Sequence, residues 1–338
     1  MSVERVESVA VVGAGSWGTA FASMLAGRHG SVTLWAHETE VCADLRDRRE
    51  NRAFLPGIVL PPTIRPTADL AEAVSGKSVV VFAVPSHHLR KVAARTAAHL
   101  APDACLVSLA KGVENGTLKR MTEVLAETSP VHAPRVAALS GPTFAREVAE
   151  GKPTGATVAA RDLSVARRLQ HALSGARFRL YADDDVTGIE IGGALKNVMA
   201  IAAGMADGLG FGHNARALLI SRGLAEISRL GVRLGAQPQT FAGLSGMGDL
   251  VLTCTGDLSR NRTVGMRVGR GEGIGEVLAG MTMVAEGVRT AVSAVELSRR
   301  TGVPMPISEQ VHCILHEGKD AREAVSALFS RALKREKE

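Results

Sequence analysis

The chain has 338 residues, of which 46% are hydrophobic, 22% are charged and 3% are aromatic, and its formal net charge is +6. This length and balance favour a folded protein of two domains and exclude a mostly disordered chain. Because aromatic residues are few and RALKREKE near the C-terminus is the longest basic block, we expect no nucleic-acid binding. A small anionic ligand explains the positive excess equally well.

The N-terminal sequence MSVERVESVAVV has two glutamates and no long apolar region after a basic start, so we expect no signal peptide. The longest apolar runs, such as 79–84, fall short of the roughly 20 residues of a spanning helix, so we expect no membrane insertion. Cys42, Cys105, Cys254 and Cys313 are scattered without a C-x-x-C pair. They are expected to be buried free thiols, and the protein to be cytoplasmic and without a metal.

Up to about residue 185, short apolar runs alternate with helix-like segments, which is typical of a parallel sheet covered by helices. The apolar runs lack strict polar alternation, as expected for strands buried on both faces. We predict strands at 8–13, 31–37, 78–84, 104–110, 135–141, 154–160 and 176–182. Helices are predicted between them, for example at 19–27, 88–100 and 117–127.

After the acidic run Asp183 to Asp185, strand-like runs cease and helix-like segments rich in Ala, Leu, Gly and Met follow. The predicted helices are 189–209, 215–234, 239–244, 250–253, 275–278, 288–301 and 308–315. We therefore predict a Rossmann domain at 1–185, an α/β fold with a doubly wound, mostly parallel sheet. An all-α substrate and catalytic domain is expected at 186–330, and a charged tail at 331–338.

The first loop, GAGSWG, fits the pattern G-x-G-x-x-G between an apolar strand and a helix. In a dinucleotide site, Gly13 would make the tight turn, Gly15 would let the backbone approach a pyrophosphate, and Gly18 would let helix and strand pack closely. The phosphates would lie at the helix N-terminus. A purely structural glycine turn is the alternative, which the surrounding strand and helix pattern disfavours.

The end of the second strand decides between the two nicotinamide dinucleotides, because an acidic residue there would bind the ribose 2′-hydroxyl. Here the strand ends at His37, which tolerates a 2′-phosphate, with Glu38 just beyond. The pattern favours NADP(H) and leaves NAD(H) open.

Polar residues follow two later strands. Lys111 comes directly after the fourth predicted strand, at the carboxyl edge where open α/β sheets bind ligands, although a solvated loop lysine is equally compatible. Gly141 and Thr143 follow the fifth strand in SGPTFA and suit an oxyanion or phosphate, or else simply begin a helix.

In the helical region, Lys196 and Asn197 stand in a segment that is otherwise apolar or small. Such a lysine either extends outward to solvent or faces a cleft where desolvation makes it a useful base, and we favour the second. Further on, Asp249 lies in a glycine-flanked turn, followed by the cluster Ser259, Arg260 and Asn261. An arginine fork beside Ser and Asn suits a phosphate, though a surface turn would use the same residues.

The ordered set GAGSWGTA, LWAHE, FAVPSH, AKG, SGPTFA, GGALKN, GMGDLVLTCT, SRN and AEGVRT resembles the bacterial NAD(P)-dependent glycerol-3-phosphate dehydrogenases over almost the whole chain. The resemblance implies interconversion of dihydroxyacetone phosphate and sn-glycerol 3-phosphate, run mainly as the reduction that supplies phospholipid backbones. It also implies a homodimer. Trp17 and Ala285 stand at positions where this sequence departs slightly from the family pattern.

The resemblance also implies roles for single residues. Lys196 matches the proton acceptor, and Lys111 lies between cofactor and substrate. Cofactor contacts fall on Ser16, Trp17, His37, Ala145, Arg260, Val284 and Glu286, in addition to the glycines. Substrate contacts fall on Gly141, Thr143, Asp249, Ser259, Arg260 and Asn261.

These roles imply a mechanism in which hydride passes to the C2 carbonyl while Lys196 donates a proton to its oxygen, and neutral Lys196 accepts that proton in reverse. Asp249 would orient the ammonium and hold the substrate hydroxyl. The alternatives are another Rossmann dehydrogenase with a catalytic lysine, of the β-hydroxyacid or 6-phosphogluconate type, and a dinucleotide sensor without activity.

Overall fold

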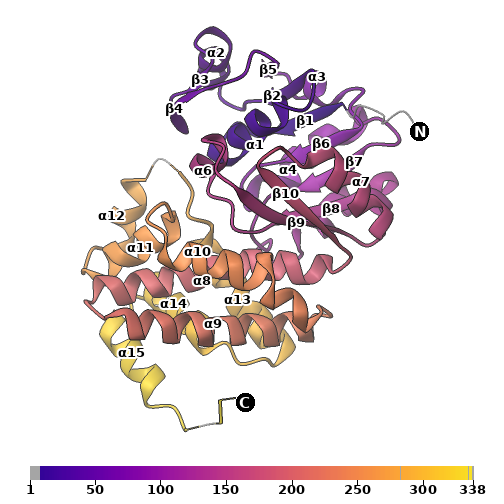
Figure 1. Cartoon of the computed structure of the whole chain (residues 1–338). Coiled ribbons are helices and arrows are strands. Elements are labelled where there is room, and N and C mark those ends of the chain that lie inside the picture. The colour runs from indigo at the N-terminus through magenta and orange to yellow at the C-terminus, as the bar shows by residue number, and fades with distance from the viewer. Residues whose placement is uncertain (1–7, 282, 334, 337–338) are drawn as a thin grey trace.

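The computed structural model describes residues 8–281, 283–333 and 335–336 and consists of a sheet-containing part and a helical part (Figure 1). Residues 1–7, which are part of the segment expected not to be a signal peptide, lie outside the described residues. Part of the predicted tail 331–338 lies outside them as well.

Short apolar runs form one eight-stranded sheet with the order β10-β9-β8-β7-β6-β1-β2-β5. All neighbouring pairs are parallel except β8 and β9, so the predicted mostly parallel sheet is confirmed. The chain leaves β1 toward β2 and β5 and then returns to β6, which places the topological switch point between β1 and β6. The strands are β1 (Val9–Val12), β2 (Val32–Trp35), β5 (Ile64–Thr67), β6 (Val79–Phe82), β7 (Cys105–Ser108), β8 (Val136–Ser140), β9 (Thr154–Ala160) and β10 (Phe178–Asp183).

Helices cover both faces of the sheet, because alternate strand residues point to opposite sides. Val9 and Val11 of β1 belong to a core shared with α1 (Ser16–Ala26), α2 (Thr39–Asp47) and α7 (Leu163–Leu173), whereas Val12 packs with the helices of the other face. Those helices are α3 (Leu70–Val74), α4 (Ser86–Thr96) and α5 (Met121–Thr128), and the short α6 (Ala145–Ala149) lies against α1. This arrangement is the doubly wound fold.

The helical part is built around α8 (Val186–Gly208), which is buried along nearly its whole length. It is the one described helix long and apolar enough to cross a membrane, and its most apolar stretch is entirely inside the protein, so it is a core helix. The helices packed on it are α9 (His213–Arg233), α10 (Asp249–Thr255), α11 (Arg260–Gly269), α13 (Glu286–Thr301) and α14 (Pro306–Glu317), while α12 (Ile274–Ala279) lies against α11 and α15 (Ala321–Phe329) against α14 (Figure 1).

Two buried carboxylates of the helical part cap helices of the sheet part. Glu190 of α8 accepts hydrogen bonds from the backbone N and Oγ1 of Thr122 at 2.8 and 2.6 Å, at the start of α5. Glu286 of α13 accepts them from the backbone N and Oγ of Ser86 at 2.8 and 2.6 Å, at the start of α4. Because carboxylates favour helix N-termini, these contacts fix the helical part against the sheet.

Several predicted element boundaries differ from the structure. The helix predicted at 117–127 begins only at Met121, because Val113 and Arg120 form an isolated β-bridge. The helix predicted at 88–100 becomes a 3₁₀ turn (Ala97–His99) after Thr96. The segment predicted as a helix at 239–244 is a 3₁₀ turn (Pro238–Ala242) followed by a π turn (Leu244–Gly248).

Other elements were not predicted. The β3–β4 hairpin (Glu50–Asn51 and Leu55–Val59), β5, α11 and α15 are additions, whereas α2, α3, α6 and α7 lie between predicted strands, where helices were expected. In addition, β10 is not buried on both faces, since it is an edge strand on which Arg179 and Tyr181 are exposed.

Candidate active site

Each glycine of the first loop has the surroundings expected for a dinucleotide site. Gly13 has a φ of 117°, and a Cβ there would lie 2.9 Å from the carbonyl oxygen of Ala83, across the switch point. A Cβ on Gly18 would lie 1.9 Å from the carbonyl oxygen of Gly13, so helix and strand touch there. A Cβ on Gly15 would meet no protein atom within 4 Å, which leaves space beside the N-terminus of α1 for a ligand.

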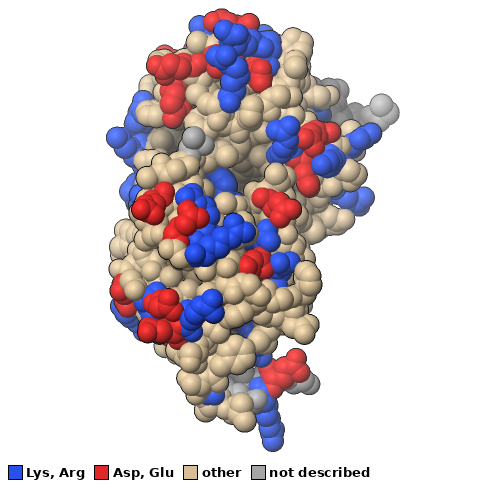
Figure 2. All heavy atoms as spheres, turned by 90° about the vertical axis from the view of Figure 1, so that its left-hand side faces the viewer, with Lys and Arg blue, Asp and Glu red and all other residues tan. Residues whose placement is uncertain are grey.

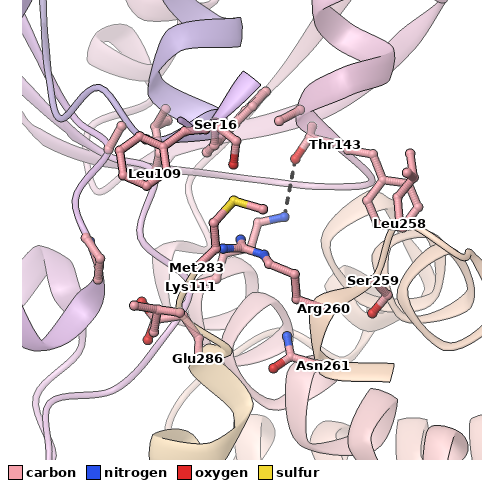
Figure 3. Close-up of a pocket in the computed structure, with 18 of the residues that line it drawn as sticks. Ser16, Leu109, Lys111, Thr143, Leu258, Ser259, Arg260, Asn261, Met283 and Glu286 are labelled. Carbon is pink, nitrogen blue, oxygen red and sulfur yellow. Dashed lines mark hydrogen bonds between the residues drawn. The ribbon is translucent and has the colours of Figure 1, made fainter. Parts of the chain in front are cut away.

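This space is part of a cavity of about 400 Å³ between the two parts of the molecule. Ser16 and Lys111 line it from the sheet part, and Arg260 and Asn261 line it from the helical part (Figure 3). Lys and Arg side chains alternate with Asp and Glu over the face of the molecule that Figure 2 shows.

At the base of the cavity, Asp249 bridges two lysines. Its Oδ1 accepts a hydrogen bond from Lys196 Nζ at 2.8 Å, and its Oδ2 accepts one from Lys111 Nζ at 2.7 Å. Lys196 Nζ also donates to Thr253 Oγ1 at 2.7 Å. Asp249 is only 1% exposed and does not line the cavity, so it orients the lysines from behind.

Burial governs the protonation of Lys196, which is 6% exposed. Desolvation lowers the pKa of Lys196 to about 8, while the Asp249 carboxylate acts in the opposite direction and the Lys111 ammonium acts in the same direction. A lysine with this pKa exchanges a proton near neutral pH, as an acid–base catalyst must.

Lys111 also joins the two loops that follow β7 and β8. Its Nζ donates to the carbonyl oxygen of Gly141 at 2.8 Å and lies 3.3 Å from Thr143 Oγ1 (Figure 3). Gly141 has a φ of 150°, and a Cβ there would lie 2.8 Å from the Cα of Ala156, so only glycine fits. Thr143 and Ala145 line the cavity, and Ala145 begins α6.

The predicted cluster Ser259, Arg260 and Asn261 forms the start of α11. Ser259 is the N-cap residue, whose Oγ accepts from the backbone N of Arg262 at 3.2 Å. Asn261 donates through Nδ2 to Asn197 Oδ1 at 2.9 Å, and Arg260 extends into the cavity (Figure 3).

The position of α11 depends on close contact with α8. A Cβ on Gly204 would lie 2.0 Å from the carbonyl oxygen of Arg262, and a Cβ on Gly265 would lie 2.0 Å from that of Ile201. These glycines let the two backbones touch, and Arg260 on α11 and Lys196 on α8 line the same cavity.

Most of the remaining predicted cofactor residues line the cavity, but His37 does not. Val284 and Glu286 line the cavity, but both carboxylate oxygens of Glu286 are bound by Ser86. Trp17 lines it too, and its buried Nε1 has no hydrogen-bond partner among the described residues. His37 and Glu38 are exposed beyond β2 and lie outside the cavity.

None of the four cysteines lines the cavity. Cys42, Cys105 and Cys254 are buried, whereas Cys313 is partly exposed, which corrects the expectation that all four are buried. His312, Cys313 and Glu317 have ligand atoms within 4.8 Å of one another on α14, but none lines the cavity.

Sequence reasoning missed several cavity residues, among them part of the β3–β4 hairpin and Thr253. The β3–β4 hairpin contributes Phe54, Leu55 and Pro56, which carry no motif that marks a ligand site. Thr253 was also missed, although its spacing of four residues from Asp249 places both on one face of a helix.

Two protein families match the chain, one in each part of the molecule. The family described as NAD-dependent glycerol-3-phosphate dehydrogenase N-terminus matches residues 8–166, and the corresponding C-terminus family matches residues 185–326. The chain belongs to the NAD-dependent glycerol-3-phosphate dehydrogenase family. The predicted family and the predicted activity of an NAD(P)-dependent glycerol-3-phosphate dehydrogenase are therefore confirmed.

The sequence similarity to relatives extends over nearly the whole chain. The chain is 55% identical over 331 residues to glycerol-3-phosphate dehydrogenase [NAD(P)+] of Citrifermentans bemidjiense, covering 98% of this chain and 99% of the relative. The protein of the same description from Myxococcus xanthus is 53% identical, covering 96% and 98%. The crystal structure of glycerol-3-phosphate dehydrogenase from Coxiella burnetii has a TM-score of 0.91 at 36% identity, covering 96% and 99%.

Proposed function

We propose that the chain is an sn-glycerol-3-phosphate:NAD(P)+ 2-oxidoreductase that reduces dihydroxyacetone phosphate reversibly to sn-glycerol 3-phosphate. The observation that carries the proposal is Lys196, buried and bound to Asp249, in a cavity that also holds Arg260 and a glycine loop. The full-length similarity to glycerol-3-phosphate dehydrogenases supports it. The product would supply glycerophospholipid synthesis in the cytoplasm.

The first loop fits a dinucleotide, because Gly15 is open to the cavity and the first amides of α1 are at its edge. The residues that would hold the cofactor are Gly13, Gly15, Ser16, Trp17, Gly18, His37, Lys111, Ala145, Arg260, Val284 and Glu286. When bound, NAD(P)H supplies the hydride. We favour NADP(H) over NAD(H), because His37 at the end of β2 tolerates a 2′-phosphate, and Glu38 leaves NAD(H) open.

The substrate is anionic, and Arg260 presents a guanidinium fork to the cavity beside Ser259 and Asn261. These three residues would bind the phosphate. Lys111, Gly141 and Thr143 would contact the rest of the substrate from the sheet part.

Lys196 would transfer the proton. In the reduction its ammonium donates a proton to the C2 oxygen of dihydroxyacetone phosphate, and in the oxidation the neutral amine accepts it. Asp249 holds the Nζ atom of Lys196 in place, and its two oxygens are bound by Lys196 and Lys111. Because Asp249 is 1% exposed and does not line the cavity, a direct contact between its carboxylate and the substrate hydroxyl would require the base of the cavity to open.

We also propose that the division into domains falls at residue 185, between β10 and α8, and that the enzyme is a homodimer. Size-exclusion chromatography with light scattering tests the second point.

The decisive experiment measures initial rates of cofactor oxidation with dihydroxyacetone phosphate and either NADPH or NADH. Turnover with this substrate, and none with 3-hydroxy acids or 6-phosphogluconate, supports the proposal. Turnover only with the carboxylate substrates would point to another Rossmann dehydrogenase. Tight cofactor binding without any turnover would leave a dinucleotide sensor.

A further inference from the structure

Asn51 is a buried polar residue outside the predicted site. It lies in the β3–β4 hairpin, is 1% exposed, and is 37 residues along the chain from Ala14 of the glycine loop. A buried amide is costly unless its donors and acceptors are paired, so its partners indicate what it does.

Asn51 Nδ2 donates to the carbonyl oxygen of Ala14 at 2.8 Å and to Thr19 Oγ1 at 2.8 Å. Thr19 Oγ1 in turn donates to the same Ala14 oxygen at 3.3 Å. On its other side, Asn51 Oδ1 accepts from the backbone N of Phe54 at 3.0 Å, within the hairpin. Asn51 therefore connects the hairpin to the middle of GAGSWG.

The carbonyl of Ala14 and the N–H of Gly15 belong to one peptide unit. Because that unit is planar and trans, they point in opposite directions, and fixing the carbonyl fixes the N–H. Gly15 lines the cavity, and we find no acceptor for its N–H among the described residues. This amide is thus available to a phosphate at the N-terminus of α1.

We propose that Asn51 is a positioning residue for cofactor binding, which holds the Ala14 carbonyl so that the Gly15 amide faces the bound pyrophosphate. The proposal rests on the proposed function only in taking the ligand to be NAD(P)H. Asn51 does not line the cavity, so it acts through the loop rather than on the ligand.

The test compares Asn51→Leu, which is close in size but cannot form hydrogen bonds, with wild type. NADPH binding is measured by fluorescence titration without substrate, and steady-state kinetics and thermal unfolding are measured in parallel. We expect the Kd for NADPH to rise about tenfold, with kcat at saturating NADPH and KM for dihydroxyacetone phosphate within about twofold of wild type.

Thr19→Val removes the second donor to Ala14 and keeps the direct Asn51 contact, so we expect a smaller rise in Kd, about threefold. This variant decides the matter if Asn51→Leu does not fold. Asn214→Leu is the matched control, because Asn214 is exposed at the start of α9, and its Kd should equal that of wild type.

An unchanged Kd for NADPH in folded Asn51→Leu, or in Thr19→Val if the first variant is unfolded, overturns the proposal. So does a parallel loss of kcat, cofactor affinity and substrate affinity, which is the sign of general disruption. Because the binding titration needs no turnover, a wild-type protein that binds NADPH but does not reduce dihydroxyacetone phosphate would contradict the proposed function and still test Asn51.

Discussion

Lys196 Nζ lies 2.8 Å from Asp249 Oδ1, and the second oxygen of the same carboxylate is bound by Lys111. One buried carboxylate thus holds two ammonium groups, one from each part of the molecule. Burial lowers the pKa of Lys196 to about 8, because desolvation of its ammonium outweighs the attraction of the Asp249 carboxylate, and the nearby Lys111 ammonium lowers the pKa further.

Replacing the proton donor should slow the chemical step strongly and leave cofactor binding intact. For Lys196→Ala we expect kcat to fall by about 10² to 10⁴-fold, the usual value of a positioned proton transfer. The Kd for NADPH should change little, since the cofactor phosphates would bind at the glycine loop and the start of α1, whereas Lys196 lies beside Asp249 at the base of the cavity. Steady-state turnover assays and fluorescence titration of the same preparation measure kcat and the Kd for NADPH. Near wild-type turnover would remove Lys196 from the mechanism.

The two directions of the reaction should depend on pH in opposite ways. Burial holds the pKa of Lys196 near 8, so its ammonium is lost as the pH rises through that value. Reduction needs the ammonium, so its kcat should decline above about pH 8, whereas oxidation needs the amine and should rise there. Asp249→Asn removes the carboxylate that raises this pKa, so the decline in reduction should begin at lower pH. Profiles that stay parallel in both directions would contradict this assignment.

Alanine substitutions at Gly15 and Gly18 of the same loop should impair the protein for different reasons. A Cβ on Gly15 meets no protein atom within 4 Å, so Gly15→Ala should fold with a nearly unchanged Tm but bind NADPH at least about tenfold more weakly. A Cβ on Gly18 would lie 1.9 Å from the Gly13 carbonyl oxygen, so Gly18→Ala should lower the Tm itself. Thermal unfolding with and without NADPH separates the two effects, and equal loss of Tm in both variants would be the contrary result.

Stability should also depend on the buried carboxyl group of Glu226. This side chain accepts hydrogen bonds from the backbone N of Ile307 at 2.6 Å and from Ser308 at the start of α14. Burial raises the pKa of Glu226 from 4.5 to about 7, since it outweighs these hydrogen bonds. The contribution of this group to stability is therefore full below about pH 4.5 and is lost as the pH rises through about 7.

Glu226→Gln keeps the shape and cannot ionise, so its unfolding free energy should lose this dependence on pH. Relative to wild type, the variant should gain roughly 3 kcal/mol between pH 4 and pH 8, from about 1.4 kcal/mol for each unit of pKa. Denaturant unfolding at both pH values measures the difference. If the unfolding free energies of the two proteins depend on pH in the same way, the pKa of Glu226 does not differ between the folded and unfolded states.

The sequence by itself determined the local features. The spacing of Gly13, Gly15 and Gly18, together with the strand pattern before them and the helix pattern after them, predicts a dinucleotide loop rather than a purely structural turn. Long stretches without strand-like runs likewise predict the helical part, and the order of motifs predicts the family. These signals are local, because they depend on residues close together in the chain.

Only the tertiary structure decided which polar groups meet. Lys111 and Asp249 are 138 residues apart, and Lys196 and Asp249 are 53 apart, so no periodicity connects them. The buried contact of Asn51 with the Ala14 carbonyl was invisible for the same reason. The pKa of Lys196 depends on desolvation and on charges brought from distant segments, which exist only once the two parts of the molecule have packed together.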